Sequence, residues 1–179
     1  GMPESEITRL CDLHVQVFKD QLEDVRLPDL PPDHPVAHYM AENRALEREA
    51  ARLLPLLEGP DPLRRAVEIG PLLERFAVFN LHYLRKENQL FPYMEKRGVE
   101  TPPKVMWEVH DQIRALLKGC RETLGRGEAA LLQEHGKALV AKSLDMIFKE
   151  ERILFPMALE RLEAADWAEI RKGDAAIGY

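Results

Sequence analysis

Residues 82–92 read His-Tyr-Leu-Arg-Lys-Glu-Asn-Gln-Leu-Phe-Pro, and residues 148–156 read Phe-Lys-Glu-Glu-Arg-Ile-Leu-Phe-Pro. Both stretches contain the pattern Glu-x-x-Leu-Phe-Pro, which begins at Glu87 and again 64 residues later at Glu151. Each copy stands in a segment whose apolar residues recur every three to four positions, the spacing of an amphipathic helix. Alternate helices of an up-and-down bundle run parallel, so the two copies can occupy equivalent positions in such a fold.

Helical periodicity continues outward from these two stretches over almost the whole chain, whereas strand and hairpin signals are scarce. Proline and glycine clusters divide the pattern, because proline lacks an N–H and cannot continue a helix. The expected fold is all-α: an antiparallel up-down-up-down four-helix bundle with an extra N-terminal helix. The expected division is an N-terminal helix and Pro-rich linker, the bundle, and a C-terminal tail with one short helix around Trp167, at 1–30, 31–165 and 166–179.

Composition narrows the class of protein before any site is considered. The 179 residues are 45% hydrophobic and 31% charged, with a formal net charge of −6 and no basic stripe. We therefore expect no nucleic-acid partner. No apolar run approaches the roughly 20 residues that span a bilayer, so we expect no membrane partner. Cys11 and Cys120 form no CxxC motif, which favours a reducing cytoplasm, and the acidic N-terminus, behind a Gly1 that resembles an expression remnant, is unlike a signal peptide.

Carboxylates and imidazoles stand where a bundle core should be apolar. Glu151 has Leu144, Ile147, Phe148, Leu154, Phe155, Ala158 and Leu162 at helical spacing, and Glu87 and His110 have similar apolar neighbours. A buried unpaired charge costs several kcal/mol, so these groups should be neutralised, paired or bound to a metal. Bundles build metal sites from inward-facing His and Glu of several helices.

Three further histidines lie on or near the inward faces of the predicted helices. His34 and His38 are four residues apart and share one helical face. His82 lies five residues before Glu87, about 140° around the helix, so both could reach a central metal from the edges of the inward stripe. Imidazole and carboxylate donors together suit iron, manganese or zinc.

At each of these positions a purely structural role is an alternative to metal binding. A single histidine on an apolar face is more often a hydrogen-bonded core residue, and a single buried glutamate more often pairs with Arg or Lys. Glu150 is the alternative ligand to Glu151 if the helix is rotated. We interpret His14, His135, Cys11 and Cys120 as packing or surface residues.

At these residues the sequence resembles the hemerythrin-like, HHE cation-binding family. The segments that carry the resemblance are 82–92, 148–156, Met106-Trp107-Glu108-Val109-His110-Asp111, and His34-Pro35-Val36-Ala37-His38 with Glu42-Asn43-Arg44-Ala45. The segment at 10–18 is similar to one that precedes the bundle in an uncharacterised prokaryotic branch, where a PAS sensor domain often follows. The resemblance covers about residues 5–163.

The family implies a bundle that holds a non-haem centre of two iron ions. Carried over by position, its metal ligands are His34, His38, His82, Glu87, His110 and Glu151. Met146 stands where a typical fourth helix supplies His, which implies fewer His ligands, an open coordination position or a single metal.

The resemblance implies a module that binds or senses oxygen, nitric oxide or redox state, rather than an enzyme. No PAS domain follows in this chain, so a signal would pass through a protein partner or a homo-oligomer. One alternative is a di-iron oxidase or peroxidase, distinguished by a substrate-sized pocket beside the metals. Another is a metal-free helical interaction scaffold, distinguished by Glu87 and Glu151 each paired with a basic side chain.

Overall fold

The structure is a computed structural model that describes residues 26–179. The expected N-terminal helix, at about 4–26, lies almost entirely outside the described residues. Within residues 26–179 every regular element is helical, which confirms the all-α class for this part of the chain. The elements are α3 (Pro35–Glu58), a 3₁₀ turn η1 (Pro62–Arg65), α4 (Ala66–Val78), α5 (Asn80–Arg85), a π-helical stretch η2 (Lys86–Leu90), α6 (Phe91–Lys96), α7 (Thr101–Arg126), α8 (Ala129–Lys149), a second π-helical stretch η3 (Glu150–Leu154), α9 (Phe155–Arg161) and α10 (Ala164–Ile177).

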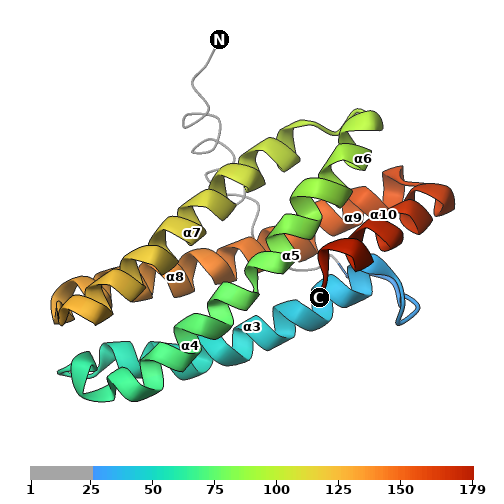
Figure 1. Ribbon diagram of the computed structural model, residues 1–179. Coiled ribbons are helices and arrows are strands. Elements are labelled where there is room, and N and C mark those ends of the chain that lie inside the picture. The colour runs from blue at the N-terminus through green and yellow to red at the C-terminus, as the bar shows by residue number, and fades with distance from the viewer. Residues whose placement is uncertain (1–25) are drawn as a thin grey trace, which may run out of the picture.

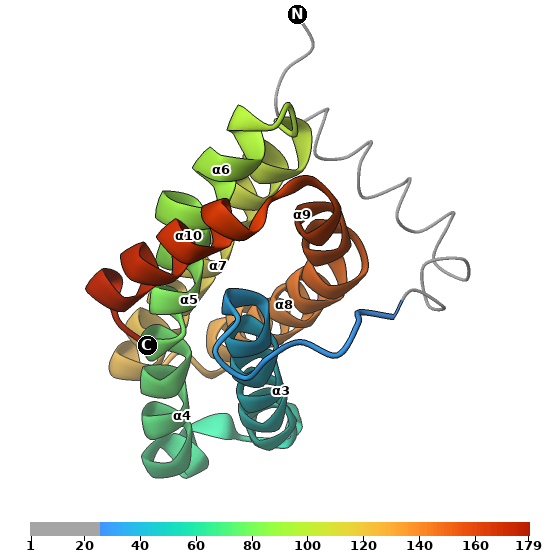
Figure 2. The same ribbon diagram turned by 90° about the vertical axis from the view of Figure 1, so that its right-hand side faces the viewer.

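The long helices pack lengthwise as a bundle (Figure 1). Helix α3 contacts α4 and α8, and α7 contacts the same two helices, so the four surround a common interior. Figure 2 looks more nearly along the bundle and shows these helices around that interior. At one end the interior is filled by fully buried side chains such as Leu53, Leu57, Ile69, Leu132 and Leu139. None of the helices formed by residues 26–179 combines the length and the apolar character needed to cross a bilayer.

Local sequence explains where the long helices begin and end. Pro35 occupies the first position of α3, where its missing N–H is no loss, and the helix ends at Glu58 before Gly59 and Pro60. Helix α7 ends at Arg126, and the residue that caps it, Gly127, has a left-handed φ of 70°. A residue with a Cβ is strained in that conformation, which explains glycine at this turn.

Both π-helical stretches lie directly before a Phe-Pro pair. The N–H of Phe91 bonds to the carbonyl of Lys86, and that of Phe155 bonds to the carbonyl of Glu150, five residues back in each case. The next residue is proline, whose ring clashes with the carbonyl four residues earlier and so favours a wider turn. The repeated Leu-Phe-Pro motif therefore inserts one extra residue into each helix at equivalent places.

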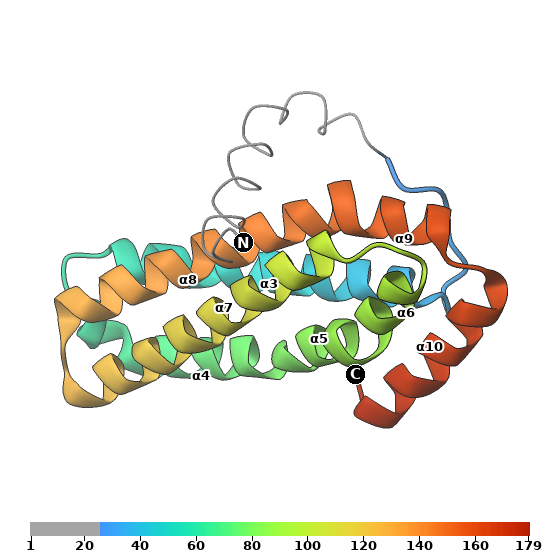
Figure 3. The ribbon, with the colours of Figure 1, turned by 90° about the horizontal axis from the view of Figure 1, so that it is seen from above.

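The C-terminal segment is a helix that crosses the end of the bundle near α5 (Figure 3). Trp167 of α10 packs against the His34 ring, with ring centroids 4.6 Å apart. Arg85 Nη1 donates to the carbonyl of Gly178 at 2.8 Å, and its guanidinium lies 4.6 Å from the Tyr179 ring centroid. The tail after the bundle is thus held against the same helix that carries His82.

Candidate metal centre

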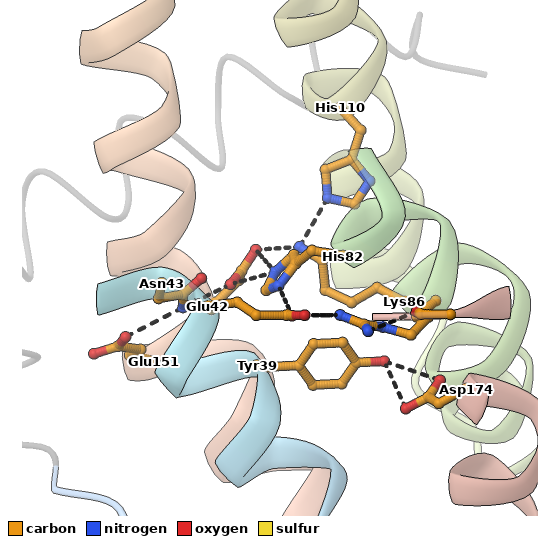
Figure 4. Close-up of polar contacts among 11 residues, drawn as sticks. Tyr39, Glu42, Asn43, His82, Lys86, His110, Glu151 and Asp174 are labelled. Atoms are coloured by element: carbon orange, nitrogen blue, oxygen red, sulfur yellow. Dashed lines mark hydrogen bonds and ion pairs between the residues drawn. The ribbon is translucent and has the colours of Figure 1, made fainter. Parts of the chain in front are cut away.

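Four polar side chains meet in the interior between α5–η2, α7 and η3, and we call them the buried cluster: His82, Lys86, His110 and Glu150. Each has at most 1% of its surface exposed. Figure 4 shows His82, Lys86 and His110 converging from two helical segments. Because water does not reach these groups, each must be satisfied by its neighbours.

A lysine ammonium occupies the middle of the buried cluster. Lys86 Nζ bonds to Glu150 Oε1 and lies 2.9 Å from His110 Nε2. An ammonium only donates, so Nε2 of His110 accepts. Burial lowers the pKa of Lys86, and the facing Glu150 carboxylate opposes that shift. The cluster therefore has a cation at its centre, supplied by the protein itself.

His82 lies between two carboxylates. Its Nε2 is 3.1 Å from Glu150 Oε2, and its Nδ1 is 2.9 Å from Glu42 Oε2. Phe79 stacks on the ring at a centroid distance of 4.3 Å. The ring is thus fixed, with Nε2 directed into the cluster and Nδ1 held by Glu42 of α3. Arg85 in turn bonds to both oxygens of Glu42.

His110 is held in the same manner from the opposite side. Its Nδ1 lies 2.8 Å from Glu87 Oε1, and Tyr83 stacks on the ring at 4.3 Å. Arg114 Nη2 bonds to both oxygens of Glu87 at 2.6 and 2.7 Å. Burial, followed by the charges of Lys86 and His82, lowers the pKa of His110 well below its usual value, so the ring is neutral at pH 7.

Glu150 is the carboxylate of the buried cluster and remains ionised. Burial opposes its ionisation, but the charges of Lys86 and His82 and their hydrogen bonds outweigh burial and lower the pKa of Glu150 to about 2. Asn43 Nδ2 donates to Glu150 Oε2 at 2.9 Å and lies 3.2 Å from Glu151 Oε1. One buried amide therefore links Glu150 with the neighbouring Glu151.

The structure brings two of the six sequence-derived ligand candidates, His82 and His110, into the buried cluster, and places Glu87 directly behind His110. His34 instead caps α3, where its Nδ1 accepts from the Val36 N–H at 3.2 Å. The half-buried His38 ring lies 4.9 Å from that of Tyr179. These two histidines share a helical face, as their spacing requires, but that face meets α10 and the C-terminal end.

Glu151 lies at the rim of the bundle, where Arg44 bonds to it, while Glu150 faces His82. The π-helical stretch is the reason. Counting back four residues from the buried Phe155 gives Glu151, but the fifth residue back, Glu150, is the one bonded across this wider turn. Before the stretch, the buried face follows Ser143, whereas Leu144 is 39% exposed.

Lys86, Glu42 and Asn43 belong to the site but were not among the predicted ligands. A signal for Lys86 exists in the sequence, since it lies four residues after His82 and one residue before the repeated glutamate. Glu42 likewise lies four residues after His38. Lysine is not a usual metal ligand, and a single amide such as Asn43 carries no sequence pattern, so the sequence alone does not assign either residue to a metal site.

The buried cluster contains two imidazoles and one carboxylate, which are donor types that metal ions accept. Both imidazoles have Nδ1 held by a carboxylate, the arrangement that orients metal-binding histidines, and the Lys86 ammonium stands in for a cation. The other nearby carboxylates are already engaged: Glu87 with Arg114, Glu42 with Arg85 and Glu151 with Arg44. Among residues 26–179, no three His, Cys, Asp or Glu side chains form a group that could hold a metal ion.

Helical bundles build metal sites from inward-facing imidazole and carboxylate groups, and this bundle buries groups of both kinds. In a comparison with protein families, the model of the hemerythrin HHE cation binding domain matches residues 34–158. The chain therefore belongs to this family of metal-binding helical domains. Residues 1–24 match a family of unknown function (DUF438). Comparison with curated proteins finds no match.

Proposed function

We propose that this domain binds one metal ion, iron in the first instance, at His82, His110 and Glu150, and that the bound ion makes the domain responsive to oxygen, nitric oxide or redox state. Two imidazoles and one carboxylate are a donor set typical of non-haem Fe(II) sites. Manganese and zinc accept the same donors and are the alternatives.

The observation that carries this proposal is the position of the Lys86 ammonium. It bonds to Glu150 and His110, so a positive charge already stabilises the two groups that would hold a metal. A metal ion would take the same place once the ammonium moves aside. The carboxylates behind the two rings, Glu42 and Glu87, would keep each Nε2 directed inward.

The pairing of the outer carboxylates argues against a second ion. Glu87, Glu42 and Glu151 each neutralise an arginine, and a metal that recruited one of them would leave that arginine without its partner. For Arg85, which is fully buried, this loss would be severe. We therefore propose one ion per chain in place of the two that the family resemblance implies.

A cleft of about 430 Å³ lies on the outer side of His82, next to the buried cluster. His82 and Glu42 form part of its lining, and Phe79, Leu46 and Val78 provide apolar walls. The polar groups nearer the surface, Glu49 and Arg75, are paired at 2.7 Å. An apolar cleft at this place suits a neutral diatomic molecule, which would have to pass the His82 ring to reach a bound ion. A bound iron ion would supply the capacity to take up such a ligand or to change oxidation state.

A metal-free interaction scaffold is the second candidate. It is favoured by a specific observation, since Glu87 is paired with Arg114 and Glu151 with Arg44. In that case the Lys86–Glu150 pair would serve only to hold the helices together.

Metal analysis separates the two candidates. The protein is dialysed to equilibrium against excess Fe(II) without oxygen, and bound metal is measured as the excess over the free concentration, for the wild type and for Glu150→Ala, His110→Ala and the neighbouring control Glu151→Ala. We expect about one ion per chain in the wild type and in Glu151→Ala, and background in the other two, with circular dichroism to verify folding. Nitric oxide should change the absorption of the iron-loaded protein. Background metal in the wild type would reject the proposal in favour of the scaffold.

A further inference from the structure

Lys86 and Glu150 occupy equivalent positions of the internal repeat. Each is the first residue of a π-helical stretch, and each precedes a Phe-Pro pair by the same interval. The repeat thus directs both side chains to the same point in the interior from two helical segments. One copy supplies a carboxylate there, whereas the other supplies an ammonium.

The ammonium is confined to this point by its surroundings. Lys86 has no exposed surface, and Nζ lies 4.9 Å from the centroid of the Tyr83 ring in addition to its bonds to Glu150 and His110. Its attraction to the ionised Glu150 is strong in a low-dielectric interior. An incoming metal ion would have to break this ion pair before it could bind the same oxygen and the same imidazole nitrogen.

We propose that Lys86 is a built-in competitor for the metal, which weakens binding at His82, His110 and Glu150 and sets the occupancy of the site. The inference rests on the proposed function, because it concerns the same three donors. It differs from that function in assigning a specific role to a residue that donates nothing to the metal. A site with such a competitor holds its ion reversibly and is filled only when free metal is plentiful.

The test is a titration of Lys86→Met with Co(II), whose absorption reports its ligands. Methionine keeps the length of the side chain and removes the charge. We expect the Kd for Co(II) to fall at least tenfold relative to the wild type. Apo Lys86→Met should unfold at a lower temperature than the wild type, because Glu150 loses its partner, and Co(II) should restore much of that loss.

The matched control is Lys149→Met. Lys149 is also a buried lysine, one residue before Glu150, but its Nζ bonds to Asp145 at 2.8 Å. Its removal should leave the Kd for Co(II) within a factor of two. Lys86→Gln provides a second variant in case Lys86→Met does not fold.

The outcomes separate the two proposals. Equal or weaker Co(II) binding by both Lys86 variants, beside a wild type that binds one ion, would overturn the competitor role and leave the proposed function intact. Binding by a Lys86 variant alone would support the competitor role and show that the native chain excludes metal. Absence of binding in all folded variants would reject both.

Discussion

The Lys86 ammonium and the Glu150 carboxylate form a fully buried ion pair between the two copies of a sequence repeat. The pair holds helical segments that are distant in the sequence. Its charges are compensated locally, and the hydrogen bonds of Asn43 and His82 to Glu150 occupy further acceptor positions. A buried pair of this kind is more costly to break than to replace as a whole.

Stability should report this asymmetry. Lys86→Met and Glu150→Met should each lower the free energy of unfolding of the metal-free protein by about 3–5 kcal/mol, since each leaves one group without its partner. The double variant Lys86→Met/Glu150→Met should lose clearly less than the sum. Urea denaturation of the four proteins in chelator measures the coupling. Additive losses would mean that the two side chains do not act as a pair.

The two histidines at the start of α3 should not contribute to metal binding, and of the two only His34 should contribute clearly to stability. His34→Ala removes the N-cap acceptor and the contact with Trp167, and we expect a loss of about 1 kcal/mol. His38→Ala should change little. Metal content of both variants should equal that of the wild type. A loss of bound metal in either would show that α3 moves to bring its histidines to the ion.

The sequence predicted the all-helical class because apolar spacing and proline-glycine breaks are local signals that the tertiary structure does not override here. It also indicated that imidazole and carboxylate groups meet inside, and the structure places His82 and His110 together. It did not identify Glu150 over Glu151, because the choice depends on one extra residue in a π-helical turn. An argument from periodicity assumes an unbroken α-helix. Across a π-helical turn, the residue that it places on the buried face is therefore wrong by one position.

His34 and His38 lie outside the buried cluster for a different reason. Their spacing correctly predicts a common face, but spacing alone does not say what covers that face. The covering element is α10 with the residues after it, which lie more than 120 positions along the chain. Lys86 shows the same limitation: its position was visible, but its bond to Glu150 depends on the packing of two helical segments.

The contact between α10 and the bundle should depend on Arg85. This fully buried guanidinium bonds to Glu42 and to the Gly178 carbonyl. Arg85→Met therefore removes the link between Glu42 of α3 and the C-terminal end of the chain. We expect backbone amides of α10 to exchange hydrogen at least tenfold faster, with α8 little changed. Arg121→Met, which removes an exposed pair with Glu74, is the control. Unaltered exchange in α10 would mean that Trp167 and other packing hold the helix without Arg85.

The pH dependence of stability should contain a contribution from Asp174. Burial raises the pKa of this carboxyl to about 6, with Arg85 and the Tyr39 hydroxyl, 3.4 Å away, acting in the opposite direction. The ordinary value is 3.8, so between about pH 4 and pH 6 the folded protein binds more protons at this residue than the unfolded chain. The free energy of unfolding therefore falls as pH rises through this window and then levels. Asp174→Asn keeps an acceptor for Tyr39 and cannot ionise. The melting temperature of this variant minus that of the wild type should therefore increase from pH 4 to pH 6 and stay constant up to pH 7. Thermal melts of both proteins at half-unit intervals measure the difference, and a gap that is independent of pH would show that the carboxyl titrates equally in the folded and unfolded chains.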